Sequence, residues 1–360
     1  MELPLDQVLV SDLDVVEAEL TDGIPWEVQF DRTLGPEVFV MRFDADGALS
    51  ESSRGLVATK SYFERLNGLC AGFGEQLAVR FYGHYGEVFD ARVLENLPNA
   101  HALTVNCLDD ACNLEAIAGL KNLSHLSLGA RNLTDKAILS RLPVGQLKSL
   151  TLEEADTKAL DLAPLAEGSN LTTLKIYGHR KNIAALGSLS TLEEFGFNPA
   201  KGMSLEFING MTDLKALKLV LGGTEHLRDI ELPNLQDLAV TQTRGFNDFG
   251  DLQRFGTLRR VLVQDEPHLK TITTGSGNPE LQHVWFHNCP GLGEIAGLED
   301  LPALRSLHAS KTGLSDGIID QLPTTVTHAL IMSKGKKGQI GKKHAGLTIG
   351  DHPDMPFFYK

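Results

Sequence analysis

Leucine recurs along this 360-residue chain at a nearly fixed interval, and that interval constrains the fold more than any other feature. Of its 57 leucines, 44 lie between residues 97 and 333. The unit L-x-x-L-x-L returns there about every 23 residues, and a fixed period of this size indicates a repeat array. The leading leucines of the units are Leu123, Leu147, Leu171, Leu192, Leu214, Leu235, Leu258, Leu281 and Leu304. Weaker units begin at Ala100 and Val326.

Each unit combines two apolar patterns. The later leucines alternate with polar residues at period two, as in Leu126-Ser127-Leu128, which predicts a β-strand. About ten residues before the next strand, a second apolar pattern has mixed helical spacing and ends in Gly, Asn or Pro turns. One unit cannot bury its apolar face alone, so stacked units must build one continuous core. A single array therefore replaces the two or three domains that the length would otherwise suggest.

The recurring pattern resembles the leucine-rich repeat family over residues 76–333, especially the internalin-like and phosphatase-regulator-like arrays with repeats of about 21–24 residues. The resemblance implies an α/β solenoid, a horseshoe of about eleven repeats with a parallel β-sheet on its concave face. One position departs from the family consensus, which has Asn or Cys at the ninth place of the repeat. Here that place holds Arg131, Ala155, His179, Ala200, Gly222, Thr243, Glu266, Cys289 and Thr312. We therefore expect the turns there to be capped by water or backbone groups.

The two ends are predicted to cap the array, which gives three regions: 1–75, 76–333 and 334–360. Before the first repeat, Trp26–Phe30 and Val38–Phe43 alternate as two strands, and Ser61–Phe73 has the apolar spacing of a helix. The acidic opening is expected to be solvated; the alternative is an arm that steers a basic partner. The Lys/Gly-rich segment from Lys334 is expected to be a solvated loop, with an anion contact as the alternative. The tail after it is expected to fold back over the last repeat.

Charge and cysteine content narrow the function classes. The chain has 33 basic and 47 acidic residues, a net charge of −14, which argues against a nucleic-acid binder or a polybasic membrane surface. Its 4 cysteines do not form a disulfide framework, and no stretch is long and apolar enough to span a membrane. The opening residues lack the pattern of a signal peptide. These features predict a cytoplasmic protein whose oligomeric state the sequence leaves open.

No catalytic motif is recognisable in the sequence. It lacks a nucleophile elbow, an H-E-x-x-H motif, a C-x-x-C pair and a dinucleotide fingerprint, so we expect neither an enzyme nor a cofactor. Cys107 and Cys112 are expected to be structural thiols. His283 and His287 lie about 13 Å apart if they share one strand, too far to share a metal ion. The chain is therefore predicted to bind no metal.

The residues between the strand leucines carry the information about binding. In this family they face the concave surface, and equal positions of successive strands form columns about 4.8 Å apart. In the second half the columns hold large side chains, with an exposed Trp285 at the centre of a cluster of Arg260, Leu262, His283, His287 and His308. Trp and Arg are enriched at interface hot spots. The first half is expected to present an acidic patch of Glu153, Glu154, Glu193 and Glu194 beside Lys175 and Tyr177.

These features predict a non-catalytic scaffold that binds a protein partner through the concave face. The acidic surplus favours a partner with a basic surface, and one concrete form is an intracellular inhibitor or immunity protein that neutralises a toxin. The alternative is a leucine-rich repeat effector that binds a host protein. A weaker alternative is an enzyme with its site in residues 1–75.

Overall fold

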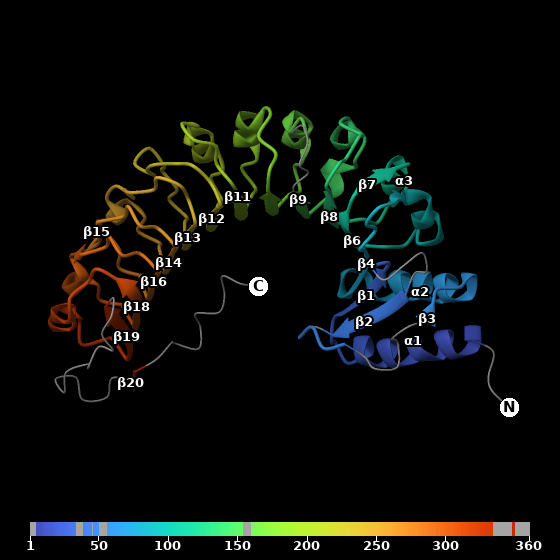
Figure 1. Ribbon diagram of the computed structural model, residues 1–360, viewed down its shortest axis with the longest axis horizontal. Helices are drawn as coiled ribbons and strands as arrows, with labels where there is room; N and C mark the ends of the chain where they lie inside the picture. The colour runs from blue at the N-terminus through green and yellow to red at the C-terminus, as the bar shows by residue number, and fades with distance from the viewer. Residues whose placement is uncertain are drawn as a thin grey trace. The chain divides into compact units, whose positions relative to one another are not determined.

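The computed structural model describes residues 5–33, 39–44, 46–49, 56–153, 160–333 and 348–349. The chain divides into two compact units, Met1–Ala185 and Leu186–Lys360. In both units, short strands alternate with loops and short helical turns, and the N-terminal unit also has two longer helices (Figure 1). The predicted boundaries at residues 75 and 333 stay predictions.

The N-terminal unit contains these helices and strands: α1 (Leu5–Thr21), β1 (Trp26–Asp31), β2 (Phe39–Asp44), β3 (Leu56–Val57), α2 (Lys60–Phe73), η2 (Gly74–Gln76), β4 (Leu77–Tyr82), β5 (Val88–Asp90), η3 (Ala91–Asn96), β6 (Ala102–Leu108), β7 (Asp110–Cys112), α3 (Glu115–Ala118), β8 (His125–Ala130), η4 (Ile138–Ser140), η5 (Val144–Gln146), β9 (Ser149–Glu153), η6 (Ala163–Glu167) and β10 (Thr173–Ile176). A further turn, η7 (Ile183–Ser188), ends beyond it. The strands run β3-β2-β1-β4-β6-β8-β9-β10 in one sheet. Pairing is antiparallel from β3 to β1 and parallel from β1 onward.

The start of this unit is a helical and stranded layer, as predicted, with one addition. The predicted strand pair is present as β1 and β2, and the predicted helix as α2, where the Thr59 hydroxyl accepts a hydrogen bond from the Tyr62 amide. The residues expected to turn between the strands, Leu34-Gly35-Pro36, lie outside the described residues. The acidic opening is not only a solvated stretch, because it forms α1.

Helix α1 buries one face and presents its acids on another. Leu13, Val16 and Leu20 are spaced three and four residues apart and are at most 2% exposed. On the polar side, Arg65 of α2 forms ion pairs with Asp14, at 3.0 Å, and with Glu17. The helix therefore packs on α2 through both apolar and charged side chains.

The C-terminal unit contains the strands β11 (Glu194–Phe197), β12 (Ala216–Val220), β13 (Asp237–Thr241), β14 (Arg260–Gln264), β15 (Thr271–Thr273), β16 (His283–His287), β17 (Glu294–Ala296), β18 (Ser306–Thr312), β19 (His328–Ser333) and β20 (Thr348–Ile349). Between them lie the single turns η8 (Glu206–Gly210), η9 (Leu252–Arg254), η10 (Leu298–Asp300) and η11 (Asp316–Gln321). The main strands run β11-β12-β13-β14-β16-β18-β19-β20, all parallel, while β15 and β17 form a separate pair. The Lys/Gly-rich segment and the aromatic tail lie outside the described residues.

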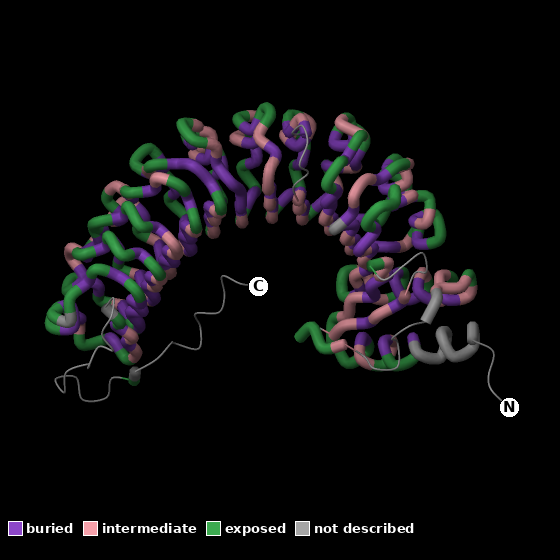
Figure 2. Tube along the Cα trace, viewed as in Figure 1, coloured by how far each residue is buried: buried purple, intermediate pink, exposed green. Residues whose placement is uncertain are grey.

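The repeat leucines form the core of each unit. In β12, for example, Leu217 and Leu219 are fully buried while Ala216, Lys218 and Val220 face the other way. Figure 2 shows the same alternation of buried and less buried positions along the strands. We call the side of the strands that is turned away from this leucine core the open face.

A column of left-handed residues ends the strands of the C-terminal unit. It consists of Leu221, Gln242, Asp265, Asn288 and Lys311, all with φ between 52° and 57°. Each of the first three donates its amide to the carbonyl of the next strand's last residue, as from Leu221 to Thr241 at 3.0 Å, and Asn288 donates to the Ser310 carbonyl within β18. The backbone amide of each of these four left-handed residues thus keeps a hydrogen-bond partner in the neighbouring repeat. This bond offsets part of the conformational free energy that the left-handed backbone costs.

At three repeats the ninth position holds a buried side chain that hydrogen-bonds to the backbone, so the expectation of water or backbone capping is wrong at His179, Glu266 and Cys289. His179 is 3% exposed and its Nδ1 accepts a hydrogen bond from the Leu160 amide at 3.1 Å. Glu266 is fully buried and its Oε1 accepts from the Thr243 amide at 2.6 Å. The Cys289 thiol donates to carbonyls of its own and the preceding repeat. Different residue types therefore perform the role that Asn has in the consensus.

Candidate partner-binding surface

The register of the parallel strands brings the predicted cluster together on the open face of the C-terminal unit. Leu262 of β14 lies beside Trp285 of β16, which lies beside His308 of β18. The next row toward the carboxyl ends places Gln264, His287 and Ser310 side by side. We call this group, centred on Trp285, the Trp285 surface.

Trp285 is half-buried, and not fully exposed as the sequence predicted. The His287 ring stacks on it with centroids 5.6 Å apart and planes 16° apart. The His308 ring contacts it from the neighbouring strand at 4.8 Å. The two imidazoles fix the indole, so a partner would meet a ring that has already lost its rotamer freedom.

Two serines, which the sequence analysis did not single out, hold the histidines in place. The Ser306 hydroxyl lies 2.8 Å from Nδ1 of His283. The Ser310 hydroxyl lies 2.7 Å from Nδ1 of His287 and 2.9 Å from Nε2 of His308. The sequence does hold a signal for them, because Ser306 and Ser310 occupy the positions of β18 that pair with His283 and His287 of β16. This signal can be recognised only when the register of the strands is known.

Arg260 and Leu262 belong to the predicted cluster, but Arg260 is engaged in an ion pair and Leu262 is almost fully buried. Arg260 forms a two-pronged ion pair with Asp237 of β13, with Nη2 and Oδ2 at 2.7 Å. Leu262 is only 3% exposed, because the neighbouring side chains cover it. Arg260 therefore lies at the edge of the Trp285 surface with its charge paired, and Leu262 packs beneath the exposed side chains.

The expected acidic patch consists largely of engaged carboxylates. In the C-terminal unit, Glu193 pairs with Lys215 and Glu194 with Lys218, both at 2.8 Å. Ion pairs of this kind leave little net negative charge on the strand face. Glu154 lies outside the described residues.

Glu153 belongs to a polar row in the N-terminal unit. Its Oε2 accepts from Asn106 at 3.2 Å, and Asn106 in turn accepts from Arg80 at 3.0 Å. Asn106 and Glu153 stand on β6 and β9, on either side of β8. They meet over Gly129 of β8, where an added Cβ would lie 2.9 Å from the Glu153 Cβ. The other two predicted residues of this unit, Lys175 and Tyr177, lie in β10 and directly after it, and both have interaction partners.

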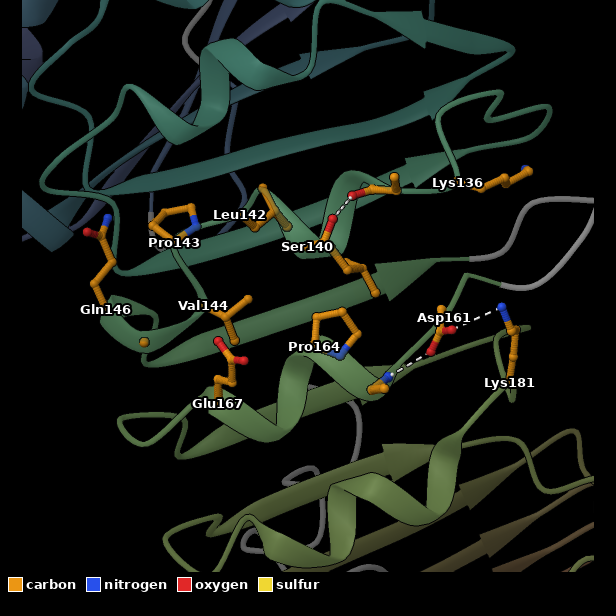
Figure 3. Close-up of a pocket in the computed structure, with 14 residues that line it drawn as sticks. Lys136, Ser140, Leu142, Pro143, Val144, Gln146, Asp161, Pro164, Glu167 and Lys181 are labelled. Carbon is orange, nitrogen blue, oxygen red and sulfur yellow. Dashed lines mark hydrogen bonds and ion pairs between the residues drawn. The ribbon is translucent and has the colours of Figure 1, made fainter.

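A hollow of about 960 Å³ lies away from the strands in the N-terminal unit, among η4, η5 and η6 (Figure 3). Leu139, Leu142 and Val144 form its buried apolar wall. Among its charged residues, Asp161 pairs with Lys181 at 2.9 Å, Lys136 donates to a carbonyl, and Glu167 is exposed.

Cys112 is exposed, so the expectation that it is a buried structural thiol is wrong. Within the described ranges, no group of three or more His, Cys, Asp or Glu residues could hold a metal ion. Among the helices in that part of the chain, none is long and apolar enough to cross a membrane.

Comparisons with known proteins extend the picture. No family model matches the chain, and no curated protein matches it. Solved structures do match: an internalin from Listeria monocytogenes has 18% identity over 98% of both chains with a TM-score of 0.49. Toll, in its Drosophila complex with Spatzle, has 14% identity over 76% of this chain and 40% of that chain, with a TM-score of 0.52.

This is a leucine-rich repeat fold. The predicted fold class, a leucine-rich repeat solenoid with a parallel β-sheet, is thereby confirmed. In the leucine-rich repeat fold the open face of the strands is the concave face. That this face carries the binding site stays a prediction. At these identities the similarity concerns the fold alone.

Proposed function

We propose that the chain is a protein-recognition scaffold and that its C-terminal unit binds another protein through the Trp285 surface. The observation that carries this proposal is a half-buried tryptophan held on a sheet between the stacked ring of His287 and the tilted ring of His308. Such a ring offers a partner a large contact area and a polar edge, at little cost in side-chain entropy. The Toll structure that shares the fold is itself a complex, with Spatzle.

The same surface argues for binding over catalysis. A serine hydroxyl between two imidazoles is the arrangement of a nucleophile and its base. Ser310, however, is only 6% exposed. Stabilising an oxyanion would need free donors, but β18, which carries Ser310, is paired on both sides, with β16 and with β19. The histidine–serine network is therefore better suited to fixing the shape of the surface.

Two finer forms of this function stay predictions from the sequence. An intracellular inhibitor or immunity protein would neutralise a toxin by covering its active face; an effector would bind a host protein. The charge argument for a basic target is weaker at the Trp285 surface than the net charge suggests, because the nearby carboxylates are paired. A toxin-like reading frame beside the gene supports the inhibitor form, and recovery of the protein outside the producing cell supports the effector form.

The test of the proposal is a comparison of Trp285→Ala with Tyr85→Ala, which removes a 54%-exposed aromatic ring from the N-terminal unit. Partners are captured from native lysate with the wild-type chain, and their affinity is then measured by calorimetry. Loss of a central aromatic contact costs about 2 kcal/mol or more, so Trp285→Ala should weaken binding by at least about 30-fold. Tyr85→Ala should leave the affinity within about twofold of the wild-type value. Equal affinities for Trp285→Ala and the wild type would refute the proposed surface.

A further inference from the structure

Three neighbouring strands of the C-terminal unit carry histidines and no carboxylates. His283 and His287 lie on β16, His308 on β18 and His328 on β19, and the residues of these strands include neither Asp nor Glu. The earlier strands of the same unit differ, because β11 and β13 each contribute a carboxylate that pairs with a cation of the next strand. This part of the open face can therefore gain positive charge but has little negative charge of its own.

The charged groups around the histidines are few in the described part of the chain. From β14, Arg260 lies beside His283 and is paired with Asp237, while Asp265 follows the strand. From β18, Lys311 follows Ser310. The Asp265 carboxylate accepts hydrogen bonds from Gln242, Gln264 and Asn288, so it is already engaged.

Burial separates the histidines into two kinds. His283 and His308 are 3% and 8% exposed, and charging a buried imidazole is costly. His287 and His328 are half-buried, so water and a partner can reach both rings.

The hydroxyl of Ser310 makes a charge on His287 compatible with the network. A protonated His287 donates from Nδ1 to the Ser310 oxygen, and that hydroxyl then donates to Nε2 of a neutral His308.

We propose that the Trp285 surface takes an acidic segment of its partner, and that the contact strengthens as pH falls through the range in which imidazoles titrate. The partner's carboxylates supply the negative charge that β16, β18 and β19 lack, and its apolar groups cover the indole. This inference rests on the proposed function, since it names the chemistry that the same surface recognises. It replaces the basic partner suggested by the net charge with an acidic one.

The chain's overall acidity does not prevent this contact. The net charge of −14 acts over the whole molecule, but at physiological ionic strength interactions between exposed charges are screened beyond about 8 Å. Groups within that distance decide the local preference. At the Trp285 surface they are the imidazoles, the Arg260–Asp237 ion pair, Lys311 and the Asp265 carboxylate, which three side-chain amides already hold.

The experiment uses Trp285 as a fluorescent reporter. The chain has two tryptophans, and Trp26→Phe leaves Trp285 alone. The Nε1 atom of Trp26 has no hydrogen-bond partner, so this background variant loses no hydrogen bond. Two 12-residue peptides with equal phenylalanine and glycine content, one with glutamates and one with lysines, are titrated at pH 5.5 and pH 8.

The glutamate peptide should bind about tenfold more tightly at pH 5.5 than at pH 8, because a shift of one unit in one imidazole pKa corresponds to a tenfold change in affinity. His287→Gln and His328→Gln should each reduce that ratio. The exposed His268, in the loop between β14 and β16, provides the control, and His268→Gln should leave it unchanged.

Equal binding of the lysine peptide, no binding of the glutamate peptide, or a pH ratio that survives both histidine variants would overturn the inference. Its failure is distinct from failure of the proposed function. If Trp285→Ala abolishes capture of the cellular partner while the glutamate peptide shows no preference, the surface stands and only its acidic specificity falls.

Discussion

At the residue scale, Glu266 is a carboxyl group with no access to water. Its Oε1 accepts the Thr243 amide, but Oε2 has no hydrogen-bond partner. Burial raises the pKa of Glu266 to about 8, and the nearby Asp265 carboxylate adds to the rise. Burial also raises the pKa of the neighbouring Cys289 thiol to about 12, which keeps that thiol protonated and inert.

Glu266 should make stability fall as pH rises. Its folded pKa of about 8 lies above the unfolded value of 4.5, so the folded state holds the proton more tightly between these values. Its contribution is complete below pH 4.5 and declines as pH rises toward 8. Glu266→Gln mimics the protonated form and should not lose stability in this way. The free energy of unfolding of Glu266→Gln minus that of the wild type should therefore be about 2–4 kcal/mol larger at pH 8.5 than at pH 5. Urea unfolding at the two pH values measures this difference, and a pH-independent difference would contradict it.

Gly129 is a second residue with a local role, because its lack of a side chain permits Asn106 and Glu153 to meet across β8. Gly129→Ala places a Cβ 2.9 Å from the Glu153 Cβ and should lower the free energy of unfolding by about 1–2 kcal/mol. Gly72 of α2 is the matched control, since nothing lies within 4 Å of its added Cβ. Gly72→Ala should stabilise by about 0.5–1 kcal/mol, because Ala favours a helix interior. Thermal or urea unfolding of the two variants in parallel tests both signs.

At the scale of elements, the strands and their register followed from the leucine period, because each strand buries one face and a slip of one residue would expose the leucines. Helix α1 was missed, although Leu13, Val16 and Leu20 carry its period, because the density of acids suggested a solvated stretch. Burial at the Trp285 surface was misjudged for a different reason. The column rule places a side chain on a face, but neighbours on adjacent strands decide how much of it stays exposed, as the covered Leu262 shows.

The left-handed column makes a prediction at this scale. Leu221 has φ of 54° and a side chain that is 61% exposed, so it incurs the left-handed cost with little burial in return. Leu221→Gly should raise the free energy of unfolding by about 1 kcal/mol. Leu221→Ala removes the same exposed surface but keeps the left-handed cost, so it should stay close to the wild type. If both variants change stability equally, backbone conformation is not the cause.

At the scale of the whole molecule, the repeated leucines build the scaffold, and the open-face residues that differ between repeats form the candidate site. Equal positions along the C-terminal unit change from the paired ions of β11–β14 to the histidines, serines and tryptophan of β16–β19. The sequence could locate this change, since columns are readable once the period is known. It could not show that the serines lock the histidines or that the acids are paired, because both depend on side-chain geometry between strands.

The central claim is that a partner covers Trp285, and quenching by acrylamide in the Trp26→Phe variant tests it most directly. Trp285 is the only tryptophan in that variant, so all tryptophan emission of the chain comes from this site. The partner is added as a segment without tryptophan, which contributes no tryptophan emission of its own. We predict that a saturating partner reduces the quenching constant several-fold, because the half-buried indole edge becomes covered. A quenching constant that stays the same while the partner is bound would contradict the account.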